Sequence, residues 1–114
     1  MIQVRRAYEP ADPADGFRVL IDRIWPRGLK KEQAAIDLWL KEVAPSAGLR
    51  KWFGHNPAKW DEFRRRYAAE LDRCPEAVQL LREKSRGGTL TLVFAARDAE
   101  HSNAAALKAY LEAR

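Results

Sequence analysis

The apolar residues of this chain form three short runs that each predict a β-strand. The runs cover residues 2–8, 17–24 and 89–95, and helical patterns fill much of the sequence between the last two. Residues 89–95 are apolar almost throughout, which is typical of a strand buried on both faces of a parallel sheet. We therefore expect residues 89–95 in a central position, with residues 17–24 as a parallel neighbour.

The stretch at residues 34–43 fits two kinds of element. Ile36, Leu38 and Leu40 recur at every second position, as in a strand, whereas Ile36, Leu40 and Val43 also fall on one helical face. The segment is short and a proline follows closely, which favours a strand.

Capping residues mark where the helices are expected to begin. Ser46 can cap a short helix that Gly54 closes, and Asn56 followed by proline starts a longer one. Asp98 or Ser102 can cap the last helix. Strands separated by helices predict the α/β class, here a small single domain over residues 1–114 with a mostly parallel sheet and helices on both faces.

Polar side chains gather where the predicted strands end. Ligands of such sheets bind beyond the carboxyl ends of the strands, and charge at the end of a buried strand is costly unless it meets a ligand or another charge. If the second strand and the last strand are neighbours, their ends share one edge. The residues expected there are Tyr8, Asp22, Arg23, Trp25, Arg27, Arg97, His101 and Asn103.

These residues predict an anion-binding pocket. Arg23, Arg27 and Arg97 carry planar, permanently charged forks that suit carboxylate or phosphate, and Asn103 can add a further donor. Tyr8 and Trp25 can form the pocket wall.

His101 and Asp22 are the candidate catalytic residues. His101 is a candidate for proton transfer, and Asp22 for orienting an arginine. The alternatives are that Asp22 only pairs with an arginine to lock the loop, and that His101 is a solvated residue in the first turn of a helix. The two histidines have no cysteine or carboxylate at ligand spacing, so we expect no metal site. No dinucleotide fingerprint or phosphate loop predicts a cofactor.

Composition and charge narrow the classes of partner. A net charge of +5 favours anionic partners, but the basic residues are spread along the chain, so nucleic acid is a weaker alternative to a small anionic ligand. No apolar run has the length of a membrane helix or a signal-peptide core, so we expect a cytoplasmic protein without a membrane partner. One cysteine excludes an internal disulfide framework. A homodimer is compatible with the sequence.

Several motifs together resemble the YeaO-like branch of the domain of unknown function 488 family. They lie at residues 4–8, 22–28, 39–46, 49–55 and 95–98, with His101 after them. The resemblance spans essentially the whole chain and implies a small bacterial α/β protein without an established activity. It also implies that Asp22, Arg23, Trp25, Arg27 and His101 are motif residues of the family.

Longer members of the wider family tend to carry a cysteine at the last strand and a Cys-His-Arg run before the final helix. Here residues 93–96 contain no cysteine, and His101, Ser102 and Asn103 stand near the later run. Thiol chemistry therefore does not carry over.

The leading hypothesis is an anion-recognising α/β protein, of which a hydrolase or transferase of a phosphorylated or carboxylated small molecule is one form. A nucleic-acid-binding or regulatory module is the first alternative. A protein-interaction module without chemistry is the second. The sequence points to a site and names no reaction.

Overall fold

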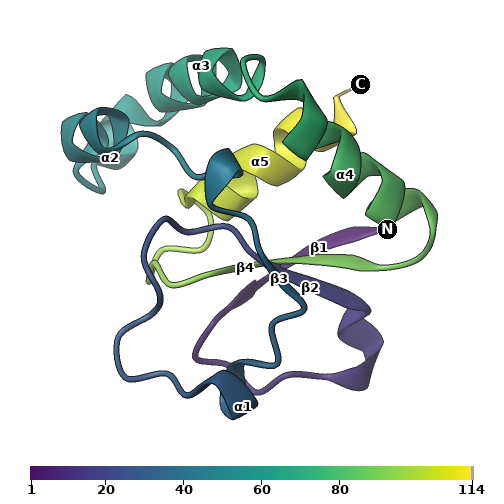
Figure 1. The fold of residues 1–114 in the computed structure, drawn as a ribbon. Helices are drawn as coiled ribbons and strands as arrows, with labels where there is room; N and C mark the ends of the chain where they lie inside the picture. Colours follow the sequence, from purple (N-terminus) through teal and green to yellow (C-terminus); the bar gives the residue numbers. More distant parts are fainter. Residues whose placement is uncertain (114) are drawn as a thin grey trace.

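Parallel strands form the sheet of the computed structural model, which describes residues 1–113. The order across the sheet is β1 (Ile2–Arg6), β4 (Leu90–Phe94), β2 (Phe17–Leu20) and β3 (Leu38–Trp39), and Figure 1 labels these strands. Every residue of β4 is buried, because β1 and β2 pair with it on either side. The α/β class, the parallel sheet and the place of β4 beside β2 are confirmed.

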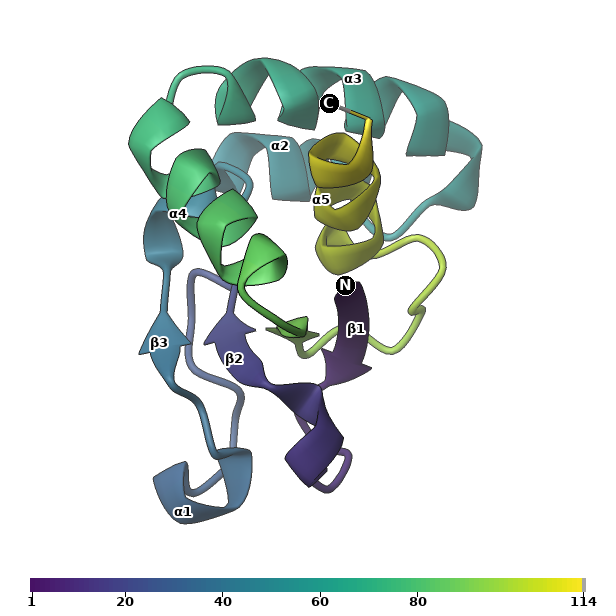
Figure 2. The same ribbon diagram turned by 90° about the vertical axis from the view of Figure 1, so that its right-hand side faces the viewer.

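The long helices all lie on one face of the sheet, as the two views in Figures 1 and 2 show. Val19, Leu92 and Phe94 belong to the main hydrophobic core on this face. The helices are α2 (Ala47–Phe53), α3 (Trp60–Leu71), α4 (Pro75–Arg86) and α5 (Asn103–Glu112).

The opposite face is covered mainly by loops, which corrects the prediction of helices on both faces. The only α-helix there within residues 1–113 is the single turn α1 (Lys31–Ala34). A second, smaller apolar cluster forms beneath the loop after β2, where Leu20 and Val93 contact Trp25 and Trp39. This loop is long enough to cover the sheet and to reach its carboxyl edge.

The second strand is shorter than the sequence predicts. β2 ends at Leu20, although the predicted strand extends to Ile24. The carboxylate of Asp22 accepts a hydrogen bond from the Ala95 N–H at 2.9 Å, so a side chain replaces the strand ladder there. Ile24 is 64% exposed and belongs to the rim of the cleft described below.

Residues 34–43 contain less strand than expected. α1 ends at Ala34, β3 covers only Leu38–Trp39, and a 3-10 turn follows at Lys41–Val43. β3 is an edge strand whose partner ends at Leu20, so only two residue pairs form. The helical interpretation is wrong for β3, and the strand interpretation holds for its two residues alone.

The predicted helix caps are confirmed. The Ser46 hydroxyl accepts a hydrogen bond from the Leu49 N–H at 3.1 Å, and Asn56 caps the 3-10 turn Pro57–Lys59 that leads into α3. For α5 the cap is Ser102 rather than Asp98. No helix within residues 1–113 has the length and apolar character needed to cross a membrane.

A charged network is buried on the loop-covered face. Asp15 and Arg18 form an ion pair, and the Arg5 Nε donates to the Asp15 carboxylate at 2.7 Å. Arg18 also donates to the carbonyl of Ala34 at 2.9 Å. Burial raises the pKa of Asp15, but hydrogen bonds from the Asp12 backbone and the two arginines outweigh it, so the net pKa is lowered.

Candidate functional site

A cleft of about 400 Å³ opens at the carboxyl ends of β2 and β4. The loop after β2 forms one wall, the start of α5 and the residues after β4 form a second, and α2 and α3 close the third. Its apolar lining residues are Ile24, Trp25, Pro26, Pro45, Phe53, Phe63, Ala95 and Ala96. Its polar lining residues are Asp22, Arg23, Arg27, Arg50, His55, His101, Ser102 and Asn103.

Asp22 ties three parts of the site together. One carboxylate oxygen accepts from the Ala95 N–H at 2.9 Å, and the other accepts from the Asn103 side-chain amide at 2.8 Å. The Trp39 indole donates to the Asp22 carbonyl at 2.7 Å. Asp22 forms no ion pair with another residue among 1–113, which argues against the alternative that it only pairs with an arginine to lock the loop, and its role in orienting an arginine stays a prediction.

The electrostatics of Asp22 reflect this half-buried position. Burial raises the pKa of its carboxyl group. The hydrogen bonds from Asn103 and Ala95, and the positive charge of Arg50, lower the pKa but do not cancel the effect of burial. Neutral donors therefore hold the carboxylate, although its burial disfavours the charged form. Asp22 serves as a clamp between the strand ends and α5.

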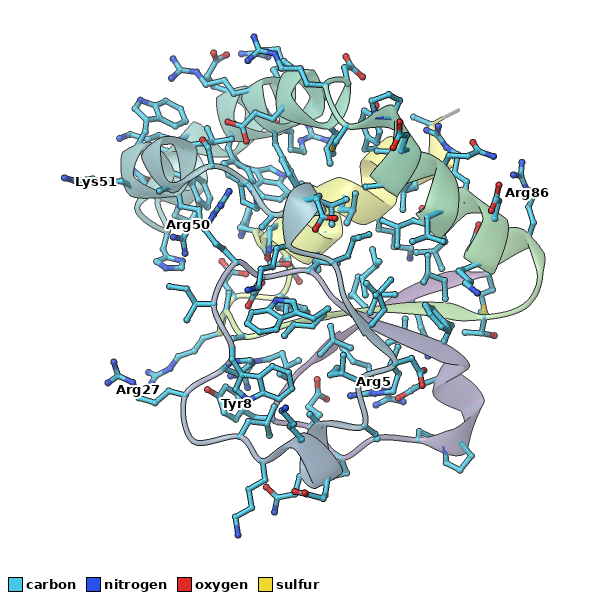
Figure 3. The ribbon with its side chains drawn as sticks, in the orientation of Figure 1. Arg5, Tyr8, Arg27, Arg50, Lys51 and Arg86 are labelled. Carbon is cyan, nitrogen blue, oxygen red and sulfur yellow. The ribbon has the colours of Figure 1, made fainter. Side chains whose placement is uncertain are left out.

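Three arginines border the cleft without an ion pair to any residue among 1–113. Arg23 and Arg27 come from the loop after β2, and Arg50 comes from α2. In Figure 3 the side chain of Arg27 extends outward from the rim. Arg50 is the cation whose position is best supported, because its positive charge lowers the pKa of Asp22, and Arg23 lines the same cleft.

Sequence reasoning missed Arg50. It lies on a helix, whereas candidates were sought where strands end. Its signals were the motif at residues 49–55 and the Ser46 cap, which fixes the start of α2. Nothing in the sequence alone places α2 against the sheet edge.

Arg97 and Tyr8 do not line the cleft. Arg97 is exposed, and the lining of the cleft includes Ala95 and Ala96 but not Arg97. The Tyr8 hydroxyl donates to the carbonyl of Arg27 at 2.9 Å, so it supports the loop rather than forming a wall. Trp25 does line the cleft, and its indole donates to the Leu29 carbonyl at 2.7 Å.

His101 lines the cleft and is held by two neighbours. Its Nδ1 lies 2.8 Å from the Asp98 carboxylate, and its ring meets the Trp60 ring edge-on with 5.3 Å between centroids. The hydrogen bond from His101 lowers the pKa of Asp98. His101 thus has a fixed position at the cleft, and its role stays a prediction.

Neither a metal cluster nor a thiol lies in the cleft formed by the described residues. Within residues 1–113 no three histidine, cysteine or carboxylate side chains are grouped to hold a metal ion. Cys74, at the start of α4, directs its thiol to the carbonyls of Glu70 and Leu71, and burial raises the pKa of the thiol. A raised pKa makes a thiol less reactive.

The whole chain, residues 1–114, matches the family described as the inactive DUF488-N3 subclade. The chain belongs to the DUF488 family. It is 43% identical over 113 residues to the uncharacterised protein Rv3073c of Mycobacterium tuberculosis (strain ATCC 25618 / H37Rv), covering 99% of this chain and 95% of that protein. It is 39% identical over 110 residues to the uncharacterised protein YeaO of Escherichia coli (strain K12), covering 96% of each.

The comparisons confirm the YeaO-like branch of DUF488 that the motifs indicate. No solved structure matches the chain. Both relatives are themselves described as uncharacterised proteins, so neither assigns a function to this DUF488 chain.

Proposed function

We propose that the protein binds a small organic anion in this cleft and catalyses no reaction on it. The observation that carries the proposal is that Arg23 and Arg50 line the cleft without an ion pair among residues 1–113, while the adjacent Asp22 is already occupied by two donors. Guanidinium groups suit carboxylate and phosphate oxygens because they donate two parallel hydrogen bonds. Two guanidinium groups without an ion-pair partner favour an anionic ligand in the cleft.

Three features support a binding role without catalysis. The family description reads "inactive". A serine or cysteine nucleophile needs a base beside it, yet the Ser102 hydroxyl serves as the α5 cap and Cys74 lies outside the cleft. Both oxygens of Asp22 accept hydrogen bonds from Ala95 and Asn103, so a structural role accounts for this carboxylate without proton transfer to a ligand.

Isothermal titration of the full chain with inorganic phosphate, sulfate, citrate and ribose 5-phosphate tests the proposal. We expect at least one of these anions to bind the wild type, and Arg50→Ala or Arg23→Ala to weaken binding by about tenfold or more, since a hydrogen bond to a charged group contributes roughly 1.5–3 kcal/mol. Arg97→Ala is the matched control, because Arg97 is an exposed arginine outside the cleft.

Equal affinity in the wild type and all three variants would contradict anion binding in the cleft. A short oligonucleotide can be titrated in the same way. If its binding constant fell steeply with salt concentration, as expected for many phosphate contacts, the nucleic-acid alternative would be favoured instead. If the wild type converted a bound anion to product and His101→Gln did not, the proposal that the protein catalyses no reaction would be contradicted. The hydrolase or transferase hypothesis would then be favoured.

A further inference from the structure

Asn103 presents an amide of fixed orientation to the cleft. Its Nδ2 donates to Asp22 at 2.8 Å, and because a carboxylate only accepts, the amide nitrogen must face Asp22. This uses one N–H. The second N–H and the amide oxygen have no protein partner among residues 1–113, so the side chain keeps one donor and one acceptor for a ligand.

The cleft also offers aromatic surface close to the cations. Trp25 is half-buried and lines the cleft, and the buried stacked pair Phe53 and Phe63 borders it. The ring centroids of that pair are 4.4 Å apart. Arg50 lies on α2 and lines the same cleft as Trp25, so a cation and an accessible aromatic ring border one cleft.

Three chemistries therefore meet in one cleft: guanidinium groups, aromatic surface and an amide with a free donor and acceptor. A phosphate satisfies the first, a flat ring the second and the edge of a nucleobase the third, since an asparagine amide is complementary to base edges. The volume of about 400 Å³ is at the small end of ligand sites, which span about 300–1,000 Å³.

We propose that the anion bound in the cleft is a nucleoside monophosphate, an assignment that rests on the proposed anion-binding function. Arg50 and Arg23 hold the phosphate, Trp25 contacts the base face, and Asn103 reads the base edge. Asp22 acts as a positioning residue, because it fixes the Asn103 amide and does not itself touch the base.

Titration of the full chain with ribose 5-phosphate, adenosine and the four common nucleoside monophosphates tests this assignment. We expect at least one nucleotide to bind about tenfold or more tightly than ribose 5-phosphate, because base stacking and base-edge hydrogen bonds each add to the affinity. Asn103→Ala should lose this preference while keeping ribose 5-phosphate binding. Arg50→Ala should weaken the binding of the nucleoside monophosphate and of ribose 5-phosphate by the same factor.

The outcomes separate the two proposals. If every nucleotide binds no better than ribose 5-phosphate in the wild type, nucleotide recognition is overturned and anion binding stands. If no anion binds, both proposals fall. If Asn103→Ala does not fold, the ratio of nucleotide affinity to ribose 5-phosphate affinity in the wild type still decides the question. Trp25→Leu then serves as the second variant and is expected to reduce this ratio. A 5′-phosphorylated oligonucleotide that binds more than about tenfold tighter than the free nucleotide would overturn the free nucleotide in favour of a nucleic-acid end.

Discussion

Arg18 and Arg23 lie close together in the sequence but have opposite environments. Arg18 is 3% exposed and donates to the Asp15 carboxylate and to backbone carbonyls, so its charge and hydrogen bonds are satisfied within the fold. Arg23 is exposed at the cleft and has no ion pair among residues 1–113. A partnered arginine holds the structure together, whereas an unpartnered arginine beside a cleft is available to a ligand.

The largest expected effect comes from breaking the buried pair. Asp15→Ala leaves the guanidinium of Arg18 buried without its counter-charge, and removing one partner of such a pair costs about 3–5 kcal/mol. Urea denaturation of the variant and the wild type measures the difference in the free energy of unfolding. A loss below about 1 kcal/mol would mean that Arg18 finds a new partner or reaches solvent, and the contrast with Arg23 would then fail.

Asp22→Ala should have a smaller effect on stability. It leaves the N–H groups of Ala95 and Asn103 without their acceptor, at a cost of about 1–3 kcal/mol in all. Asp22→Asn keeps one acceptor oxygen and should fall between the wild type and Asp22→Ala. Thermal unfolding of the three proteins compares them, and equal stability of all three would show that Asp22 does not clamp the strand ends.

The pH dependence of stability should have opposite signs at Asp15 and Asp22. The folded pKa of Asp15 is lowered, so its contribution is fully present above the unfolded pKa of about 3.9 and is lost as pH falls through the folded pKa. The folded pKa of Asp22 is raised, so its contribution is present below about 3.9 and is lost as pH rises through the folded pKa.

Subtracting the curve of each alanine variant from that of the wild type isolates these two contributions. We expect the difference for Asp15→Ala to shrink as the pH falls below about 4, and the difference for Asp22→Ala to shrink as the pH rises above about 4. Urea midpoints between pH 2 and pH 7 supply the curves. Two differences with the same sign of slope would contradict the assigned environments.

The contrast between the arginines also explains what the sequence could reveal. β4 was predictable because a strand buried on both faces is apolar throughout, and the place of Asp22 and His101 at one sheet edge followed from the parallel arrangement. The environment of Arg18 was not predictable, since its place between Phe17 and Val19 is equally typical of a solvated position. Its partner Asp15 lies in a predicted loop.

The smallest effect on stability is expected for Arg50, which like Arg23 is an arginine at the cleft without an ion pair among residues 1–113. Arg50 is exposed and has no ion pair among residues 1–113, so Arg50→Ala should change the free energy of unfolding by less than about 0.5 kcal/mol, as substitutions at such surface positions do. Arg86→Ala, an exposed arginine at the end of α4, is the matched control. If Arg50→Ala destabilised the protein by several kcal/mol while Arg86→Ala did not, Arg50 would be a structural cation like Arg18. Because a ligand that binds only the folded state adds to its stability, Arg50→Ala should also reduce the stabilisation that a bound anion confers, whereas Arg86→Ala should retain it.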